Sequence, residues 1–108
     1  MALKKSEIKP PVLPKETHDV PELGGEVVVR GLLLSERLAL FADAQADGGR
    51  FSHIARLLAC VVIDAEGKPV FTADEWEQFG ASNFEAVLRV FEIARRLSGL
   101  DAEVREKN

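Results

Sequence analysis

The chain has 108 residues, which is enough for one domain around a single hydrophobic core. Its net charge of −4 and its sequence pI near 5.2 argue against a non-specific nucleic-acid binder, which would need clustered lysine and arginine. No apolar run approaches the roughly 18 residues needed to span a bilayer, no apolar segment follows Lys4 and Lys5 as in a signal peptide, and a single cysteine favours a reducing cytoplasm.

Residues 1–23 are predicted to form an N-terminal arm that is extended and partly disordered. Four of the five prolines lie in this segment, and each removes a backbone donor and keeps its predecessor extended. The arm either frays in solvent or orders against a neighbouring subunit, where Val12 and Leu13 would fill pockets. A single globular domain over residues 24–100 and a polar tail over residues 101–108 complete the predicted organisation.

Residues 26–30 are predicted to form a strand, with Val27 and Val29 on the same face. An isolated strand leaves its backbone hydrogen bonds unmade and therefore needs a partner. Two segments are candidates, namely the arm at residues 17–20, folded back through a turn, and the short run 69–71. The hairpin with the arm is the local choice.

Two helices are predicted to follow the strand. The first begins after an N-cap at Ser35, and Leu34, Leu38 and Phe41 recur at helical spacing to give one apolar face. The second runs from about residue 51 to residue 62. Its apolar stripe consists of Phe51, Ile54, Ala55, Leu58, Val61 and Val62.

Capping boxes mark the last two predicted helices. The Thr72 hydroxyl can accept from the amide of Glu75 while the Glu75 carboxylate reaches back. Gly80 is expected to end this short helix, and a second box is expected to start at Ser82. The last helix extends to about Ser98, with Gly99 after its C-cap.

The last helix has the broadest apolar face and is predicted to be the centre of the core. This face consists of Phe84, Val87, Leu88, Val90, Phe91, Ala94 and Leu97. The predicted fold class is therefore α+β, mostly helical, with about four helices and a small antiparallel sheet near the N-terminus.

Residues typical of catalysis or metal binding are sparse. The sequence contains no CxxC or HExxH motif, no glycine-rich phosphate loop and no nucleophile elbow. Cys60 is expected to be a buried, inert thiol, and His18 and His53 each lack a second ligand at metal spacing. These patterns predict a protein that is not an enzyme and that has no cofactor and no metal.

Three features are candidates for binding, each with a simpler structural alternative. Trp76 is the only tryptophan and belongs either to an interface or to the core. Residues 64–77 hold five acids and one lysine, which form either an acidic docking face or a solvated loop. Arginines on the last helix give a modestly basic surface that serves solubility: Arg89, Arg95 and Arg96.

The order of short motifs resembles the tail assembly chaperone family of long-tailed, non-contractile bacteriophages. The family's opening pattern is matched by Val20, Glu22, Gly24, Gly25, Val27, Val29, Arg30, Leu32, Glu36 and Arg37. Its loop, cap and final helix are matched by Asp64, Gly67, Lys68, Pro69, Phe71, Thr72, Glu75 and the run 87–100. The similarity covers residues 18–108. The chain departs from the family pattern at Leu23, where an aromatic residue is common, and at Leu33 and Leu34, where small residues are usual.

The resemblance implies a non-enzymatic assembly factor in the host bacterial cytoplasm. Such proteins coat the tape measure protein before the tail tube polymerises, and this chain would be the shorter of two frameshift-related forms. The expected partners are the tape measure protein, the tail tube protein and further copies of the chain in a weak homo-oligomer, with no nucleic acid and no membrane. The candidate partner-binding residues are Trp76, Arg30, Arg37, Val12 and Leu13.

Two other functions remain as alternatives. A small structural head–tail or tail-completion protein would persist in purified virions, whereas a chaperone would be absent from them. An antitoxin or transcription regulator would need a basic recognition helix, which the predicted helices do not provide.

Overall fold

A three-stranded antiparallel sheet forms the base of the structure. The computed structural model describes residues 1–47 and 50–99. Strand β1 (Lys15–Val20) pairs along its length with β2 (Gly25–Arg30), and β2 pairs on its other side with the short β3 (Val62–Ile63). The predicted hairpin between the arm and the first strand is therefore confirmed.

The turn of the hairpin depends on one glycine. A short 3-10 helix, η2 (Pro21–Leu23), ends at Gly24, whose φ of 96° lies in the left-handed region that side chains with a Cβ rarely adopt. The Gly24 amide donates to the carbonyl of Pro21 at 2.9 Å and closes the turn.

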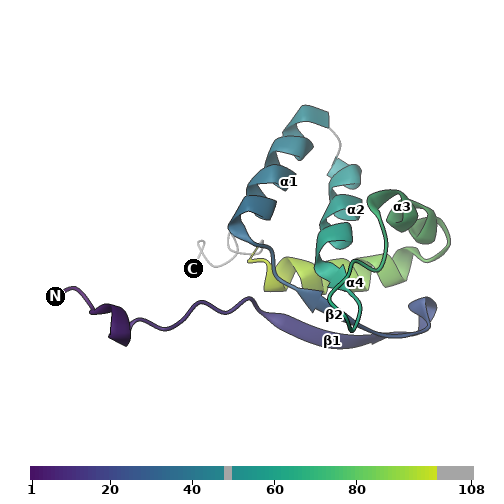
Figure 1. Ribbon diagram of the computed structural model, residues 1–108. Coiled ribbons are helices and arrows are strands. Elements are labelled where there is room, and N and C mark those ends of the chain that lie inside the picture. Colours follow the sequence, from purple (N-terminus) through teal and green to yellow (C-terminus); the bar gives the residue numbers. More distant parts are fainter. Residues whose placement is uncertain (48–49, 100–108) are drawn as a thin grey trace, which may run out of the picture.

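Four helices cover the sheet on one side (Figure 1). They are α1 (Leu34–Asp47), α2 (Arg50–Val61), α3 (Ala73–Ser82) and α4 (Phe84–Leu97). Helices α2 and α4 both pack on β2, α1 packs on α2, and α3 packs on α2 and α4. The α+β class, with four helices and a small antiparallel sheet near the N-terminus, is confirmed. In the described part of the chain, no helix is long and apolar enough to cross a membrane.

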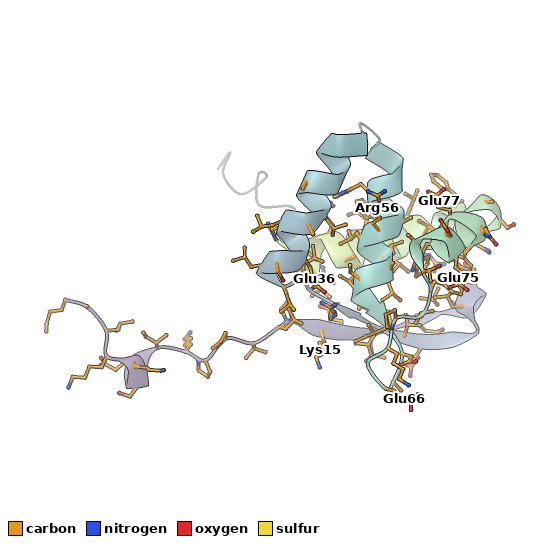
Figure 2. The ribbon with its side chains drawn as sticks, turned by 45° about the horizontal axis from the view of Figure 1, so that its top comes forward. Lys15, Glu36, Arg56, Glu66, Glu75 and Glu77 are labelled. Atoms are coloured by element: carbon orange, nitrogen blue, oxygen red, sulfur yellow. The ribbon has the colours of Figure 1, made fainter. Side chains whose placement is uncertain are left out.

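The N-terminal residues extend away from this body (Figures 1 and 2). Residues 1–14 contain one 3-10 turn, η1 (Lys5–Glu7), and continue directly into β1. The predicted boundary after residue 23 and the domain over 24–100 stay predictions. The predicted tail at 101–108 lies outside the described residues.

The termini of the helices agree with the local signals in part. The capping box at Thr72 is confirmed, since the Glu75 amide donates to the Thr72 hydroxyl at 3.2 Å and the Thr72 amide donates to the Glu75 carboxylate at 2.8 Å. Gly99 follows α4 with a φ of 72°, as predicted. Helix α1 begins one residue before the predicted cap Ser35, because the Glu36 carboxylate accepts from the amide of Leu33 at 2.9 Å.

Two predictions about the junction of α3 and α4 are wrong. Helix α3 continues through Gly80 to Ser82, and a Cβ at Gly80 would lie in ordinary contact with Val87 of α4, at 3.4 Å. The second capping box does not form, because Ser82 is still helical and Asn83 takes the cap position. The Asn83 side chain instead donates to the carbonyl of Phe79 at 3.1 Å.

The core is shared by α2 and α4 rather than centred on α4 alone. Leu57, Leu58 and Val61 of α2 are fully buried, and so are Val90 and Ala94 of α4, whereas Phe91 of α4 is half-buried. The third strand is also displaced from its predicted place, because Val62 pairs with Val29 and residue Pro69 contributes only an isolated bridge to Ile63. Proline lacks the amide that a regular ladder needs there.

Candidate partner-binding surfaces

Three leucines at the start of α1 form an exposed apolar surface. Leu33, Leu34 and Leu38 have 51%, 73% and 59% of their surfaces exposed, and we refer to them as the α1 ridge. Leu34 and Leu38 were predicted to share one apolar face with Phe41, whose side chain lies outside the described part; among the described side chains of this helix, Leu40 enters the core. Clustered exposed leucines are typical of a surface that another molecule covers.

The base of the α1 ridge is fixed by an ion pair between β2 and α1. Arg30 Nη1 and Nη2 each donate to the Glu36 carboxylate at 2.8 Å, and the same carboxylate caps the amide of Leu33. Both side chains are largely buried, and the Arg30 hydrogen bonds lower the pKa of Glu36. This bidentate geometry is the strong form of a charged hydrogen bond and holds the ridge against the sheet. Figure 2 shows Glu36 at this corner.

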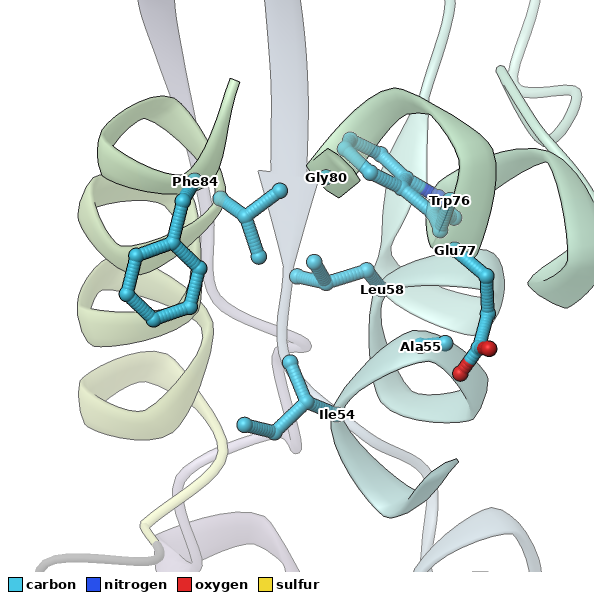
Figure 3. Close-up of a pocket in the computed structure, with 8 residues that line it drawn as sticks. Ile54, Ala55, Leu58, Trp76, Glu77, Gly80 and Phe84 are labelled. Carbon is cyan, nitrogen blue, oxygen red and sulfur yellow. The ribbon is translucent and has the colours of Figure 1, made fainter. Parts of the chain in front are cut away.

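A second apolar surface is a groove between α2, α3 and α4 (Figure 3). Its volume is about 200 Å³. We refer to it as the α2–α4 groove, and its walls are formed by Ile54, Ala55, Leu58, Trp76, Glu77, Gly80, Phe84 and Val87. Phe84 is 65% exposed, although its position in the apolar stripe predicted burial. The groove therefore offers apolar walls and an aromatic rim to a partner of suitable shape.

Trp76 forms a wall of this groove but belongs to the core. Only 2% of its surface is exposed, and Phe71 and Phe79 make edge-on contacts with its ring at centroid distances of 5.1 and 5.5 Å. Its indole Nε1 is buried and has no hydrogen-bond partner among the described residues. Of the two alternatives for this tryptophan, burial favours the core.

Glu77 lines the groove, and three further acids lie on α3 and in the first turn of α4. Residues 73–85 contain four acids and no lysine or arginine. All four acids are exposed: Asp74, Glu75, Glu77 and Glu85. A positively charged segment is the electrostatic complement of these acids.

The third surface is the part of the predicted arm that precedes β1. From here on, the arm means these residues, 1–14, which are anchored to the body at Pro14. The Gly31 amide donates to the carbonyl of Pro14 at 2.8 Å. A Cβ at Gly31 would lie 2.7 Å from the Leu97 carbonyl oxygen and 3.0 Å from Pro14, so only glycine fits at this crossing. Beyond the anchor, Val12 is 81% exposed and Leu13 is half-buried.

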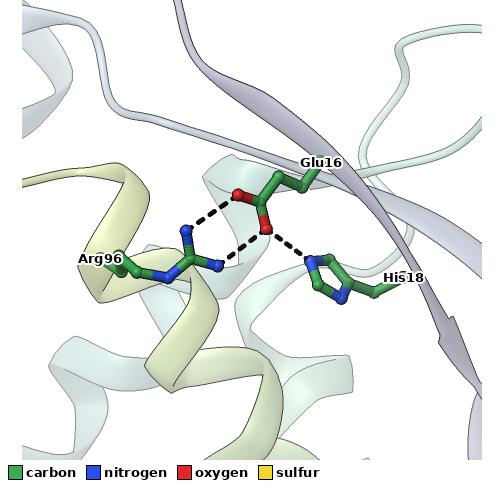
Figure 4. Close-up of polar contacts among 3 residues, drawn as sticks. All are labelled: Glu16, His18 and Arg96. Atoms are coloured by element: carbon green, nitrogen blue, oxygen red, sulfur yellow. Dashed lines mark hydrogen bonds and ion pairs between the residues drawn. The ribbon is translucent and has the colours of Figure 1, made fainter.

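Two ion pairs tie the hairpin to α4. Arg96 donates to both oxygens of Glu16 at 2.8 and 2.7 Å, and His18 Nε2 lies 2.8 Å from the same carboxylate (Figure 4). Arg89 donates to Glu22 at 2.6 Å. The hydrogen bonds from Arg96, and then that from His18, lower the pKa of Glu16 to about 2. Two of the three arginines expected to serve solubility therefore also hold β1 in place.

We expect the Glu16 ion pair to make the free energy of unfolding depend on pH in the acidic range. The folded-state pKa of Glu16 is about 2, against an ordinary value of 4.5, so its stabilising contribution is complete above about pH 4.5 and is lost as the pH falls toward 2. Urea unfolding at several pH values should show a smaller acid-induced loss in Glu16→Gln than in the wild type. An identical pH dependence in the two proteins would contradict the assignment.

The described residues offer little for catalysis. Within residues 1–47 and 50–99, no group of three His, Cys, Asp or Glu residues is placed to hold a metal ion. Cys60 is half-buried, and burial raises the pKa of its thiol, which makes it a poor nucleophile at neutral pH. The nearby charges of Arg30 and Glu36 oppose each other at this thiol.

The five candidate residues lie at three separate places. Arg30 and Arg37 lie at the corner of the α1 ridge, Trp76 lines the groove, and Val12 and Leu13 belong to the arm. Sequence reasoning missed the exposure of Leu38 and Phe84 and the role of Gly31. The departure of Leu33 and Leu34 from the family's small residues was the available signal for the ridge.

Comparison with known proteins found a similar solved structure. The sequence matches no protein-family model and no curated protein. The structure is similar to one described as "Structure of bacteriophage HK97 tail assembly chaperone", with a TM-score of 0.62 and 25% identity over 85% of this chain and 88% of that one.

The chain is similar to a phage tail assembly chaperone. The resemblance indicated by the sequence motifs is confirmed, because the similarity extends over most of both chains rather than over one motif. It supports a role in tail assembly.

Proposed function

We propose that the protein is a non-enzymatic tail assembly chaperone that binds the tape measure protein in the host bacterial cytoplasm and promotes assembly of the tail tube. The observation that carries this proposal is the similarity to the HK97 tail assembly chaperone over 85% of the chain. Direct contact with the tail tube protein and weak self-association belong to the same proposal. Neither catalysis nor a cofactor is required by it.

The α1 ridge is the surface proposed to meet the tape measure protein. A long helical tape measure with apolar stripes would aggregate unless these stripes were covered. Leu34 and Leu38 are one helical turn apart, so their exposed side chains have the same spacing as an apolar stripe on a partner helix. Arg30 and Arg37 lie at the same corner, where the Arg30–Glu36 ion pair keeps the leucines in a fixed orientation.

Co-expression with a tape measure protein from the same genome tests this function. Affinity-tagged wild type should retain the tape measure protein in solution, and Leu34→Asp should reduce the retained amount at least about tenfold, because a charge would have to be desolvated in the apolar contact. Leu34→Met is the matched control, since it keeps the apolar surface, and it should retain the partner. Both variants should unfold at temperatures near that of the wild type, because Leu34 is 73% exposed.

Two outcomes would contradict the proposal. Failure of the wild type to retain the tape measure protein would remove the function itself. Persistence of the protein in purified virions would instead favour a structural tail-completion component.

A further inference from the structure

The α2–α4 groove has features that the α1 ridge does not share. It is a concave apolar site of about 200 Å³ with the exposed ring of Phe84 at its rim, Glu77 in its wall and three further exposed acids on α3 and α4. The complementary occupant is an apolar segment that carries positive charge. Such a segment exists within this chain.

The arm has the required chemistry. Residues 1–14 contain three lysines and one glutamate. Its large apolar side chains are exposed in the isolated chain: Met1 (121%), Leu3 (65%), Ile8 (54%) and Val12 (81%). Leu3 and Ile8 line a common hollow together with Lys5, Lys9, Pro10 and Pro11, so apolar and basic side chains lie together in this segment. A proline-rich segment is already extended and loses little conformational freedom on docking.

The arm and the groove lie at opposite ends of α4. The arm leaves the body where Gly31 crosses Pro14 and Leu97, beside the last turn of this helix. The groove lies at its first turn, where Phe84 and Val87 form the wall. Fourteen residues of α-helix span about 20 Å. Figure 2 shows the same separation, with Lys15 on the side of the arm and Glu77 on the far side of the body.

We propose that residues 1–12 of one copy dock in the α2–α4 groove of the next copy. Ile8 and Leu3 cover the apolar walls and the ring of Phe84, and the lysines of the arm lie beside Glu77 and the other acids of α3 and α4. Because donor and acceptor sites lie at opposite ends of each copy, the contact is head-to-tail and can add further copies in one direction. This inference deepens the proposed self-association and is independent of tape measure binding by the α1 ridge.

Complementation between two variants tests the arrangement. Ile8→Asp disables the arm, and Phe84→Asp disables the groove; both residues are exposed, and an acid is favourable at the first turn of a helix. Light scattering across a concentration series should show association of the wild type and at least a tenfold weaker association of each variant alone. An equimolar mixture of the two should form one-to-one pairs that grow no further, since each pair joins one intact arm to one intact groove.

Charge reversal provides a second test of the same contact. Glu77→Lys should weaken association, Lys9→Glu should weaken it as well, and the double variant should recover part of the loss. The matched control is Glu66→Lys, because Glu66 is an exposed acid in the 64–68 loop, away from the groove (Figure 2).

Several results would overturn the proposal. A wild type that stays monomeric at all concentrations would remove the contact between copies, including the case in which the arm fills its own groove. Variants that associate as the wild type does would place self-association elsewhere. A mixture that fails to pair would exclude the head-to-tail arrangement. Phe84→Asp should still retain the tape measure protein, because the α1 ridge is unchanged in it. If it does, an absence of self-association would overturn only this proposal and not the proposed function.

Discussion

Replacement of Trp76 by alanine is expected to lower the free energy of unfolding by about 3–5 kcal/mol. Only 2% of this side chain is exposed, and two phenylalanine rings make edge-on contacts with it from α3 and the preceding loop. Removal of the indole would leave a cavity that joins the α2–α4 groove. The same side chain was also a candidate for direct partner binding. A core residue should lower stability when it is removed, whereas an interface residue should lower partner binding and leave stability unchanged.

Trp76→Ala removes the single tryptophan, so its fluorescence cannot report unfolding. The free energy of unfolding is therefore measured by urea unfolding followed by circular dichroism. The matched control is Phe84→Ala, which removes an aromatic ring that is 65% exposed on the rim of the same groove. We expect it to cost less than about 1 kcal/mol, because surface substitutions rarely cost more. A loss of stability for Trp76→Ala as small as that of the control would show that the tryptophan is not part of the core.

Local signals in the sequence predicted most of the elements. The capping box at Thr72 involves two residues three positions apart, and their hydrogen bonds form whatever lies around them. The left-handed glycine after α4 is equally local. The failed box at Ser82 shows the limit, because α3 stays helical past the glycine that predicted its end.

Apolar periodicity did not reveal which side of a helix is covered. Leu34 and Leu38 have helical spacing, as core residues do, yet both are exposed, while Leu40 of the same helix is buried. Phe84 likewise continues the stripe of α4 beyond the point where α2 and α3 cover it. A stripe identifies a helix with an apolar face, but the neighbouring elements decide how much of that face meets solvent.

The contacts that hold the candidate surfaces could not be predicted from sequence spacing. Glu16 pairs with Arg96 across 80 positions and Glu22 pairs with Arg89 across 67. Each of these side chains is an ordinary charged residue on its own element, and only the crossing of the hairpin over α4 brings them together. By contrast, Arg30 and Glu36 are six positions apart and both fall in the motif that resembles the phage chaperones.

Replacement of Leu57 by alanine is expected to lower the free energy of unfolding by about 2–5 kcal/mol. Leu57 is fully buried in α2, a helix that packs on α1, α3, α4 and β2, so its removal would leave a cavity in a close-packed interior. The matched control is Leu38→Ala, the same substitution at a side chain that is 59% exposed on the α1 ridge, and we expect a loss below about 0.5 kcal/mol. Urea unfolding of both variants measures the difference. Equal losses at the two positions would show that Leu57 is not part of the core, whereas the expected difference would confirm that α2 contributes its buried face to the core.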